Sequence, residues 1–188
     1  MKKIFLVLLL LFGSLFATTE KKVPTVVPIP WIKENLSNPN LVIVDLRKKE
    51  DYDKGHITGA VNMPGLDSLF EKDTWMMPKL DFLKELFSNA GINQDSLVVA
   101  YDNGDFFWAA RLYWILEVFG HENVGLSKYA YGKYMQDNLP ITTETSKPVR
   151  KEFIPRVDNN QIETKLSTLL AIGKKNIIDG REKSHYEG

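Results

Sequence analysis

The chain has 188 residues, which is room for one medium-sized domain or for one domain and part of another. Hydrophobic residues make up 44% of it and aromatic residues 11%, enough for a packed core, so global disorder is excluded. Lys and Arg together number 24, as do Asp and Glu, and no basic stretch stands out, which argues against nucleic-acid binding. There is no cysteine, and the three histidines are scattered, so we expect no disulfide, metal site, cofactor or cysteine nucleophile in this chain.

The first residues are typical of an export signal. Lys2 and Lys3 precede an apolar run from 4 to 16, and Ala17 offers a small residue for cleavage. The run is shorter than the roughly 20 apolar residues that a membrane span needs. We therefore expect residues 1–17 to be a cleaved signal peptide. The mature protein would then lie in a bacterial periplasm, without a stable membrane anchor.

The elements that follow suggest alternating helices and strands. Residues 18–30 contain three prolines and are predicted to be a linker. A short helix is expected over 31–36, and the apolar run 41–44 predicts a strand that is covered on both faces.

Further along, 81–90 shows a helical apolar stripe and 97–101 is a second buried-strand run. The turn 102–105 then leads into a predicted helix over 106–119, which is apolar on nearly every side. Such a helix has to be covered on two sides. One cover is the sheet, and a second domain is the natural candidate for the other.

This alternation predicts an α/β domain with a mainly parallel sheet and helices on both faces, spanning residues 31–143. The polar stretch 144–152 is expected to be a linker. A second unit is expected over 153–188, with a helix near 161–172 and a strand starting at 177–178.

Two segments of the chain repeat one pattern. Asp45 and Arg47 follow an apolar strand, with Tyr52 five residues after the Arg; Asp179, Arg181 and Tyr186 have the same spacing. The offset is 179 − 45 = 134 residues. Three matches in register after the same kind of element indicate a duplicated domain whose second copy is cut off at Gly188.

The motifs resemble those of tandem-domain rhodaneses, sulfurtransferases of the thiosulfate and 3-mercaptopyruvate type. The matching blocks are Asp45-Leu46-Arg47, Tyr52, Gly55-His56-Ile57-Thr58-Gly59-Ala60, Pro64, Tyr101-Asp102-Asn103-Gly104, Ala110-Arg111-Leu112-Tyr113-Trp114, Phe119-Gly120-His121-Glu122-Asn123-Val124 and Leu139-Pro140-Ile141-Thr142. One block departs from the family, because Lys128-Tyr129-Ala130 and Tyr134 stand where the family usually has an aspartate, paired glycines and a Trp.

The resemblance implies a sulfur-transfer mechanism that depends on a Cys, a residue that this chain lacks. In the family a Cys thiolate after a central strand takes a sulfane sulfur as a persulfide and passes it on to an acceptor. Here Asp102 occupies that nucleophile position, as is typical of the inactive first domain of tandem members. We expect Asp102 to cap the next helix or to bond turn amides. The Cys would belong to a second domain, near position 102 + 134 = 236, so the chain is predicted to be inactive as given.

Five motif residues are assigned structural roles. His56 is expected to bond loop backbone, while Arg47 with Asp45, and Arg181 with Asp179, are expected to pair and fix the loops after their strands. His185 stands where many tandem sulfurtransferases have an Arg that helps to bind the anionic donor. It is therefore a candidate for substrate binding.

Two functions remain open. One is a sulfurtransferase with a small-molecule sulfur donor and acceptor, whose first domain packs against its own second rhodanese domain. The other is a Cys-free rhodanese-like module that only binds or regulates a partner. A related phosphatase would need a Cys, which this chain does not have.

Overall fold

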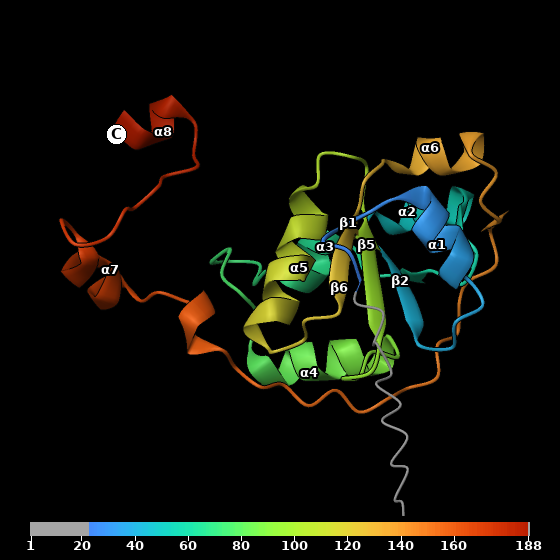
Figure 1. The fold of residues 1–188 in the computed structure, drawn as a ribbon, viewed down its shortest axis with the longest axis horizontal. Helices are drawn as coiled ribbons and strands as arrows, with labels where there is room; N and C mark the ends of the chain where they lie inside the picture. Colours follow the sequence, from blue (N-terminus) through green and yellow to red (C-terminus); the bar gives the residue numbers. More distant parts are fainter. Residues whose placement is uncertain (1–22, 188) are drawn as a thin grey trace, which may run out of the picture.

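The computed structural model describes residues 23–187, so the predicted signal peptide lies outside the described residues. A five-stranded sheet forms its centre (Figure 1). The strands, in sheet order, are β1 (Val26–Val27), β6 (Val124–Ser127), β5 (Leu97–Tyr101), β2 (Leu41–Asp45) and β4 (Val61–Asn62), and all neighbouring pairs are parallel. The predicted parallel α/β fold is thus confirmed, and both central strands lie where the apolar runs predicted them.

Helices cover both faces of this sheet, because alternate strand residues point to opposite sides. Val42, Val44 and Val98 belong to one core, and Ile43 and Val99 to the other. The first core contains side chains of α3 (Gly65–Leu69), α4 (Leu80–Asn89) and α5 (Phe107–Val118). The second core contains side chains of α1 (Ile29–Asn35) and α6 (Tyr131–Gln136), and α2 (Lys49–Lys54) lies beside them (Figure 1). A small antiparallel pair, β3 (His56–Ile57) with β7 (Ile141–Thr142), closes this side.

The first domain begins earlier than predicted. Residues 23–30 were expected to belong to a linker, yet β1 pairs with β6 and forms an edge of the sheet. Val23, Val27 and Ile29 are buried in the second core. Prolines prevent regular ladder bonding only locally, so a two-residue edge strand fits between Pro24 and Pro28. The linker prediction is therefore wrong for this part of the chain.

The predicted linker 144–152 is likewise bound to the first domain. Residues 144–158, which we call the strap, run along its surface. The amide of Lys151 donates to the carbonyl of Ser88 at 3.0 Å, and that of Arg156 donates to the carbonyl of Phe119 at 2.8 Å. Phe153, expected to begin the second unit, is fully buried and packs edge-on against Phe87, with 5.1 Å between ring centroids. Its side chain thus belongs to the core of the first domain.

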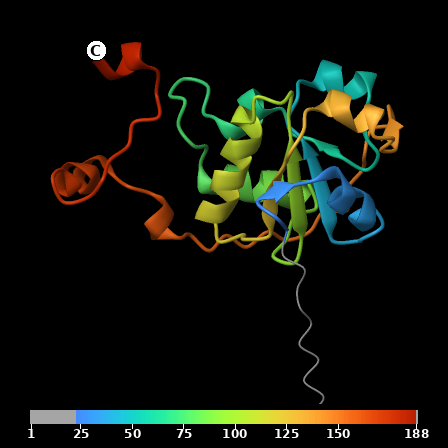
Figure 2. The ribbon, with the colours of Figure 1, turned by 45° about the horizontal axis from the view of Figure 1, so that its top comes forward.

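The C-terminal segment after the strap makes few contacts with the rest. It contains a 3₁₀ turn (Asn159–Gln161), α7 (Lys165–Ala171) and α8 (Lys183–Glu187), and it extends away from the sheet in both views (Figures 1 and 2). Helix α7 is shorter than predicted because the Thr164–Ser167 capping box fixes its start. The predicted strand at 177–178 is wrong: Ile178 is 89% exposed and no strand forms there, since no neighbouring strand pairs with it.

None of the helices within residues 23–187 is long and apolar enough to cross a lipid bilayer.

Candidate functional site

The sheet has a crevice at the carboxyl ends of its central strands. After β2 the chain adds β4 on one side and then returns to place β5 on the other, so the strand order reverses between β2 and β5. Ligand sites of open parallel sheets lie beyond the strand ends at such a reversal. Arg47 follows β2 here, and Asp102 follows β5.

Asp102 is enclosed by the loop that leads into α5. The side chain is only 3% exposed, and its carboxylate accepts three backbone hydrogen bonds. Oδ1 accepts from the amides of Gly104 at 2.8 Å and Phe106 at 3.3 Å, and Oδ2 accepts from the amide of Ala109 at 3.1 Å. Asp102 therefore bonds turn amides and the first turn of α5, the two arrangements that the sequence suggested. These three amides therefore already bind an anionic group, the carboxylate of Asp102.

Behind this loop, Asp45 and Arg47 form a buried ion pair. The Nη2 atom of Arg47 lies 2.6 Å from Oδ2 of Asp45, and the two side chains are 4% and 0% exposed. Arg47 also donates to the carbonyl of Gly55 at 2.8 Å, and Tyr101 donates its hydroxyl to Asp45 at 2.6 Å. Burial lowers the pKa of Arg47, but the bonds and charge of Asp45 outweigh this effect and leave it raised. Burial and then the charge of Asp45 raise the pKa of Tyr101, which keeps it a neutral donor. Arg47 thus ties the end of β2 to the loop at Gly55.

His56 serves the same loop from inside. It is fully buried and stacks on Tyr52, with 3.5 Å between ring centroids. Its Nδ1 lies 2.8 Å from the carbonyl oxygen of Tyr52, and its Nε2 lies 3.1 Å from that of Glu144 in the strap. The hydroxyl of Tyr52 donates to the carbonyl of Ala60 at 2.8 Å and accepts from the amide of Ser146 at 3.1 Å. His56 therefore joins backbone segments and does not face the crevice.

The residues of the second repeat are not brought to the crevice. Arg181 pairs with Asp179 at 2.5 Å on the surface of the C-terminal segment. His185 is exposed on α8, which lies apart from the strand ends in Figures 1 and 2. Its role in substrate binding stays a prediction.

The N-terminal end of α5 presents aromatic surface beside the Asp102 loop. Phe106 and Phe107 are 39% and 56% exposed, and Phe106 has a left-handed backbone (φ 62°), which a bulky residue adopts only under strain. Trp108 turns inward and packs against the backbone of Gly65, where any side chain larger than hydrogen would collide with its ring. Apart from the sheet, α5 was predicted to need a second packing partner. Phe106 and Phe107 remain exposed in this structure, whereas Trp108 packs against Gly65.

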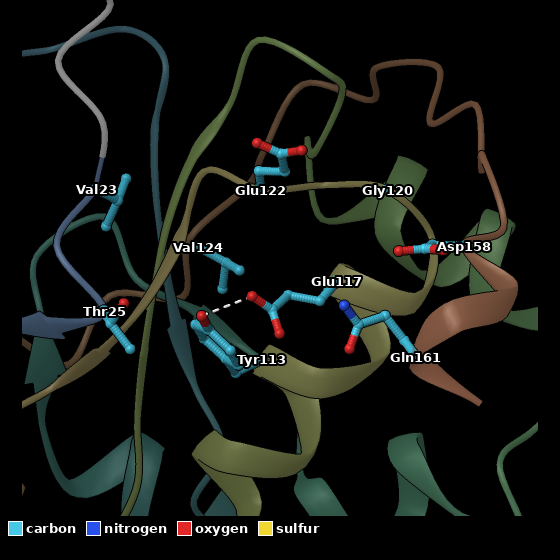
Figure 3. A pocket seen from close by; sticks show the side chains of 9 residues that line it. All are labelled: Val23, Thr25, Tyr113, Glu117, Gly120, Glu122, Val124, Asp158 and Gln161. Atoms are coloured by element: carbon cyan, nitrogen blue, oxygen red, sulfur yellow. Dashed lines mark hydrogen bonds between the residues drawn. The ribbon is translucent and has the colours of Figure 1, made fainter. Parts of the chain in front are cut away.

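Two hollows differ in their charge. One, of about 520 Å³, lies at the crevice and is lined by Arg47, Lys48, Lys49, Asn103 and Trp108 among others, with Glu50 and Asp67 also present. The other, of about 400 Å³, lies near the C-terminal end of α5 and is lined by Glu117, Glu122 and Asp158 (Figure 3). Tyr113 donates its hydroxyl to Glu117 there at 2.7 Å. The carboxylates of this second hollow repel anions, whereas the hollow at the crevice also contains cationic side chains. No group of three or more metal-ligating side chains within residues 23–187 could hold a metal ion.

Sequence reasoning missed two residues near this surface. Tyr101 was noted as a strand residue and within a family motif, but no role was given to its hydroxyl, which completes the Asp45 site. Arg111 was noted only within a family motif, although it and Glu117 are the two charged residues of a mainly apolar helix. That contrast was the available signal for Arg111.

Comparisons with known proteins agree with this geometry. Residues 29–137 match the family described as "Rhodanese-like domain". The chain is 29% identical to "Thiosulfate sulfurtransferase" of Corynebacterium glutamicum, covering 87% of this chain and 56% of that protein. It is 28% identical to "Sulfur carrier protein TtuD" of Thermus thermophilus, covering 84% and 58%.

The crystal structure of the 3-mercaptopyruvate sulfotransferase SseA from Escherichia coli is similar, with a TM-score of 0.75 and 26% identity over 86% of this chain and 67% of that one. The chain thus spans somewhat more than half the length of the curated relatives that it matches. On the match over 29–137 and the shared five-stranded parallel fold, the chain belongs to the rhodanese-like domain family.

Proposed function

We propose that this chain is the non-catalytic part of a rhodanese-type sulfurtransferase. The whole enzyme would move sulfane sulfur from thiosulfate or 3-mercaptopyruvate to a thiophilic acceptor such as cyanide. The observation that carries this proposal is the Asp102 carboxylate, which stands where the family places a thiolate and accepts hydrogen bonds from the amides of Gly104, Phe106 and Ala109. A carboxylate cannot form a persulfide, and its negative charge repels an anionic donor.

The persulfide would form on a Cys of a second rhodanese-like domain that packs against this one. Its thiolate attacks the outer sulfur of thiosulfate and sulfite leaves; cyanide then takes that sulfur as thiocyanate and regenerates the thiolate. The exposed Phe106 and Phe107 support such a partner, because exposed neighbouring aromatic side chains mark interaction surfaces. The greater length of the curated relatives also supports it.

Thiocyanate formation tests the proposal. Residues 18–188 alone, incubated with thiosulfate and cyanide, should match a no-protein control. The intact gene product should form thiocyanate. Replacing the Cys of its second domain by Ser should abolish this activity. Activity of the Cys-free chain that survives purification would overturn the assignment of Asp102.

The alternative is a Cys-free module that binds or regulates a partner, which the absence of cysteine favours. An intact gene product with no Cys, inactive in the same assay, would select this alternative.

We further propose export to a bacterial periplasm, with no stable membrane anchor after cleavage and no nucleic-acid partner. The lysines and apolar run before Ala17 support export, and the even charge balance argues against nucleic acid. Fractionation of the native host tests this proposal, because protein found only in the cytoplasm would refute it.

A further inference from the structure

Arg111 is a half-buried cation without a carboxylate partner in the described chain. It lies on α5, and its Nε donates to the carbonyl of Leu69 at 3.4 Å. No Asp or Glu within residues 23–187 forms an ion pair with it, although Asp67 and Glu71 lie on α3 and just after it. Burial lowers the pKa of Arg111, and no neighbouring charge offsets this effect.

Two aromatic rings hold the guanidinium in place. Its Cζ lies 4.4 Å from the ring centroid of Phe70 and 4.7 Å from that of Trp114. Such cation–π contacts fix the plane of the guanidinium but satisfy none of its N–H groups in plane. Within residues 23–187 only the Nε of Arg111 donates a hydrogen bond, so its Nη atoms are available to an acceptor from another protein surface.

The rings around Arg111 continue into exposed aromatic surface. Phe70 stacks on Phe107 at 6.3 Å and meets Trp75 edge-on at 5.8 Å. Trp75 is 62% exposed and has a left-handed backbone (φ 57°), which costs free energy for a bulky residue and is typical of functional segments. We call Phe70, Trp75, Phe107 and Trp114 the aromatic patch. An Arg among Trp and other aromatic side chains is the composition of protein–protein hot spots.

The chemistry of the missing acceptor follows from these contacts. A planar guanidinium with free Nη donors matches a carboxylate, which it binds through two parallel hydrogen bonds. Water-excluding rings around it strengthen that pair. We propose that Arg111 and the aromatic patch form a docking site for a protein surface that presents one carboxylate between apolar side chains.

The occupant that we assign to this site is the second rhodanese-like domain, so this choice rests on the proposed function. Phe107 belongs both to the aromatic patch and to the exposed start of α5. The proposed function already assigns the start of α5 to contact with the second domain. The patch and the start of α5 are therefore one continuous surface.

Nuclear magnetic resonance of the ¹⁵N-arginine-labelled chain tests the docking chemistry. The probes are two matched peptides, acetyl-Leu-Glu-Phe-amide and acetyl-Leu-Gln-Phe-amide. The acidic peptide should shift the Nε–Hε signal of Arg111 and bind about tenfold tighter than its amide twin. Arg150 and Arg181 are internal controls, because each already pairs with a carboxylate, of Glu85 and Asp179 respectively.

Two variants separate docking from a structural role. Arg111→Met should lose the preference for the acidic peptide without lowering the thermal unfolding temperature, whereas Arg150→Met should keep the preference. Equal affinity for both peptides, or equal shifts at Arg150, would overturn the proposal.

A last arm tests the occupant. In the intact gene product with its second domain, the Nε–Hε signal of Arg111 should already be shifted and insensitive to the acidic peptide. A signal identical to that of this chain would overturn the assigned occupant, while the thiocyanate assay would still decide the proposed function independently.

Discussion

The chain contains the same Asp-x-Arg geometry twice, once inside the protein and once on its surface. The Arg backbone amide donates to the Asp Oδ1 at 2.9 Å in the first segment and at 3.0 Å in the second. The Nη2–Oδ2 distances are 2.6 Å and 2.5 Å. Yet the side chains of Arg47 and Asp45 are 4% and 0% exposed, and those of Arg181 and Asp179 are 62% and 26% exposed.

The difference between these segments separates local from tertiary causes. Spacing alone brings carboxylate and guanidinium together, because both copies pair whether or not a sheet surrounds them. Burial requires the rest of the domain, since Tyr101 of β5 and the loop at Gly55 complete the first site. The same contrast holds for the aromatic residues that follow, because Tyr52 is 1% exposed and Tyr186 is 69% exposed. The same motif is therefore expected to contribute very differently to the free energy of unfolding in the two segments.

The largest expected effect comes from breaking the buried pair. Asp45→Ala leaves the guanidinium of Arg47 buried and uncompensated, so we expect the free energy of unfolding to fall by about 4 kcal/mol. The matched variant Asp179→Ala should leave urea unfolding unchanged, because its pair is exposed. Equal loss in both variants would mean that the second segment is packed in solution.

Phe153 tests where the first domain ends. Phe153→Ala removes a fully buried ring from contact with Phe87, and we expect a loss of about 3 kcal/mol in the free energy of unfolding. The control Ile178→Ala removes an apolar side chain that is 89% exposed and should not change it. If Phe153→Ala unfolded at the same urea concentration as the parent chain, the strap would not be part of the first domain.

The fold was largely predictable, because apolar runs at 41–44 and 97–101 are strand signals that need no tertiary information. The role of Asp102 was also predictable, since an Asp in the turn before a helix commonly accepts hydrogen bonds from turn amides and from the first turn of that helix. The strap could not be predicted, because its sequence has no apolar periodicity and its backbone bonds go to the carbonyls of Ser88 and Phe119, which are distant in sequence. The strand predicted at 177–178 does not form, although its local apolar pattern is typical of a strand, because no partner strand lies beside it.

A smaller effect is expected at the aromatic position of the motif. Tyr52→Phe removes a hydroxyl that bonds the carbonyl of Ala60 and the amide of Ser146, so about 2 kcal/mol of stability should be lost. Tyr186→Phe, on the exposed copy, should unfold like the parent chain. Hydrogen exchange at the amide of Ser146 gives a second measurement, because it should become faster only in Tyr52→Phe.

The exposed pair of Asp179 and Arg181 should contribute least to stability, but it should have a clear effect on the pKa of Asp179. Hydrogen bonds from the Arg181 side chain and then its backbone amide lower the pKa of Asp179 from 3.8 to about 2. A lowered pKa in the folded chain means that the stabilisation is complete above about pH 4 and disappears as the pH falls towards 2. The carboxyl carbon of Asp179 should therefore titrate in nuclear magnetic resonance with a midpoint near 2.

Removing the partner of Asp179 tests whether the pair forms without a surrounding fold. In Arg181→Gln the midpoint should return towards 3.8, the ordinary value for an Asp, because the charged donor is gone. High salt should move the parent midpoint in the same direction, since ions screen an exposed pair. Urea unfolding at neutral pH should be the same in both proteins, because the pair lies on the surface and such pairs add little to stability. A parent midpoint already at 3.8 would show that the motif does not pair by itself, and that the buried copy owes its geometry to the sheet.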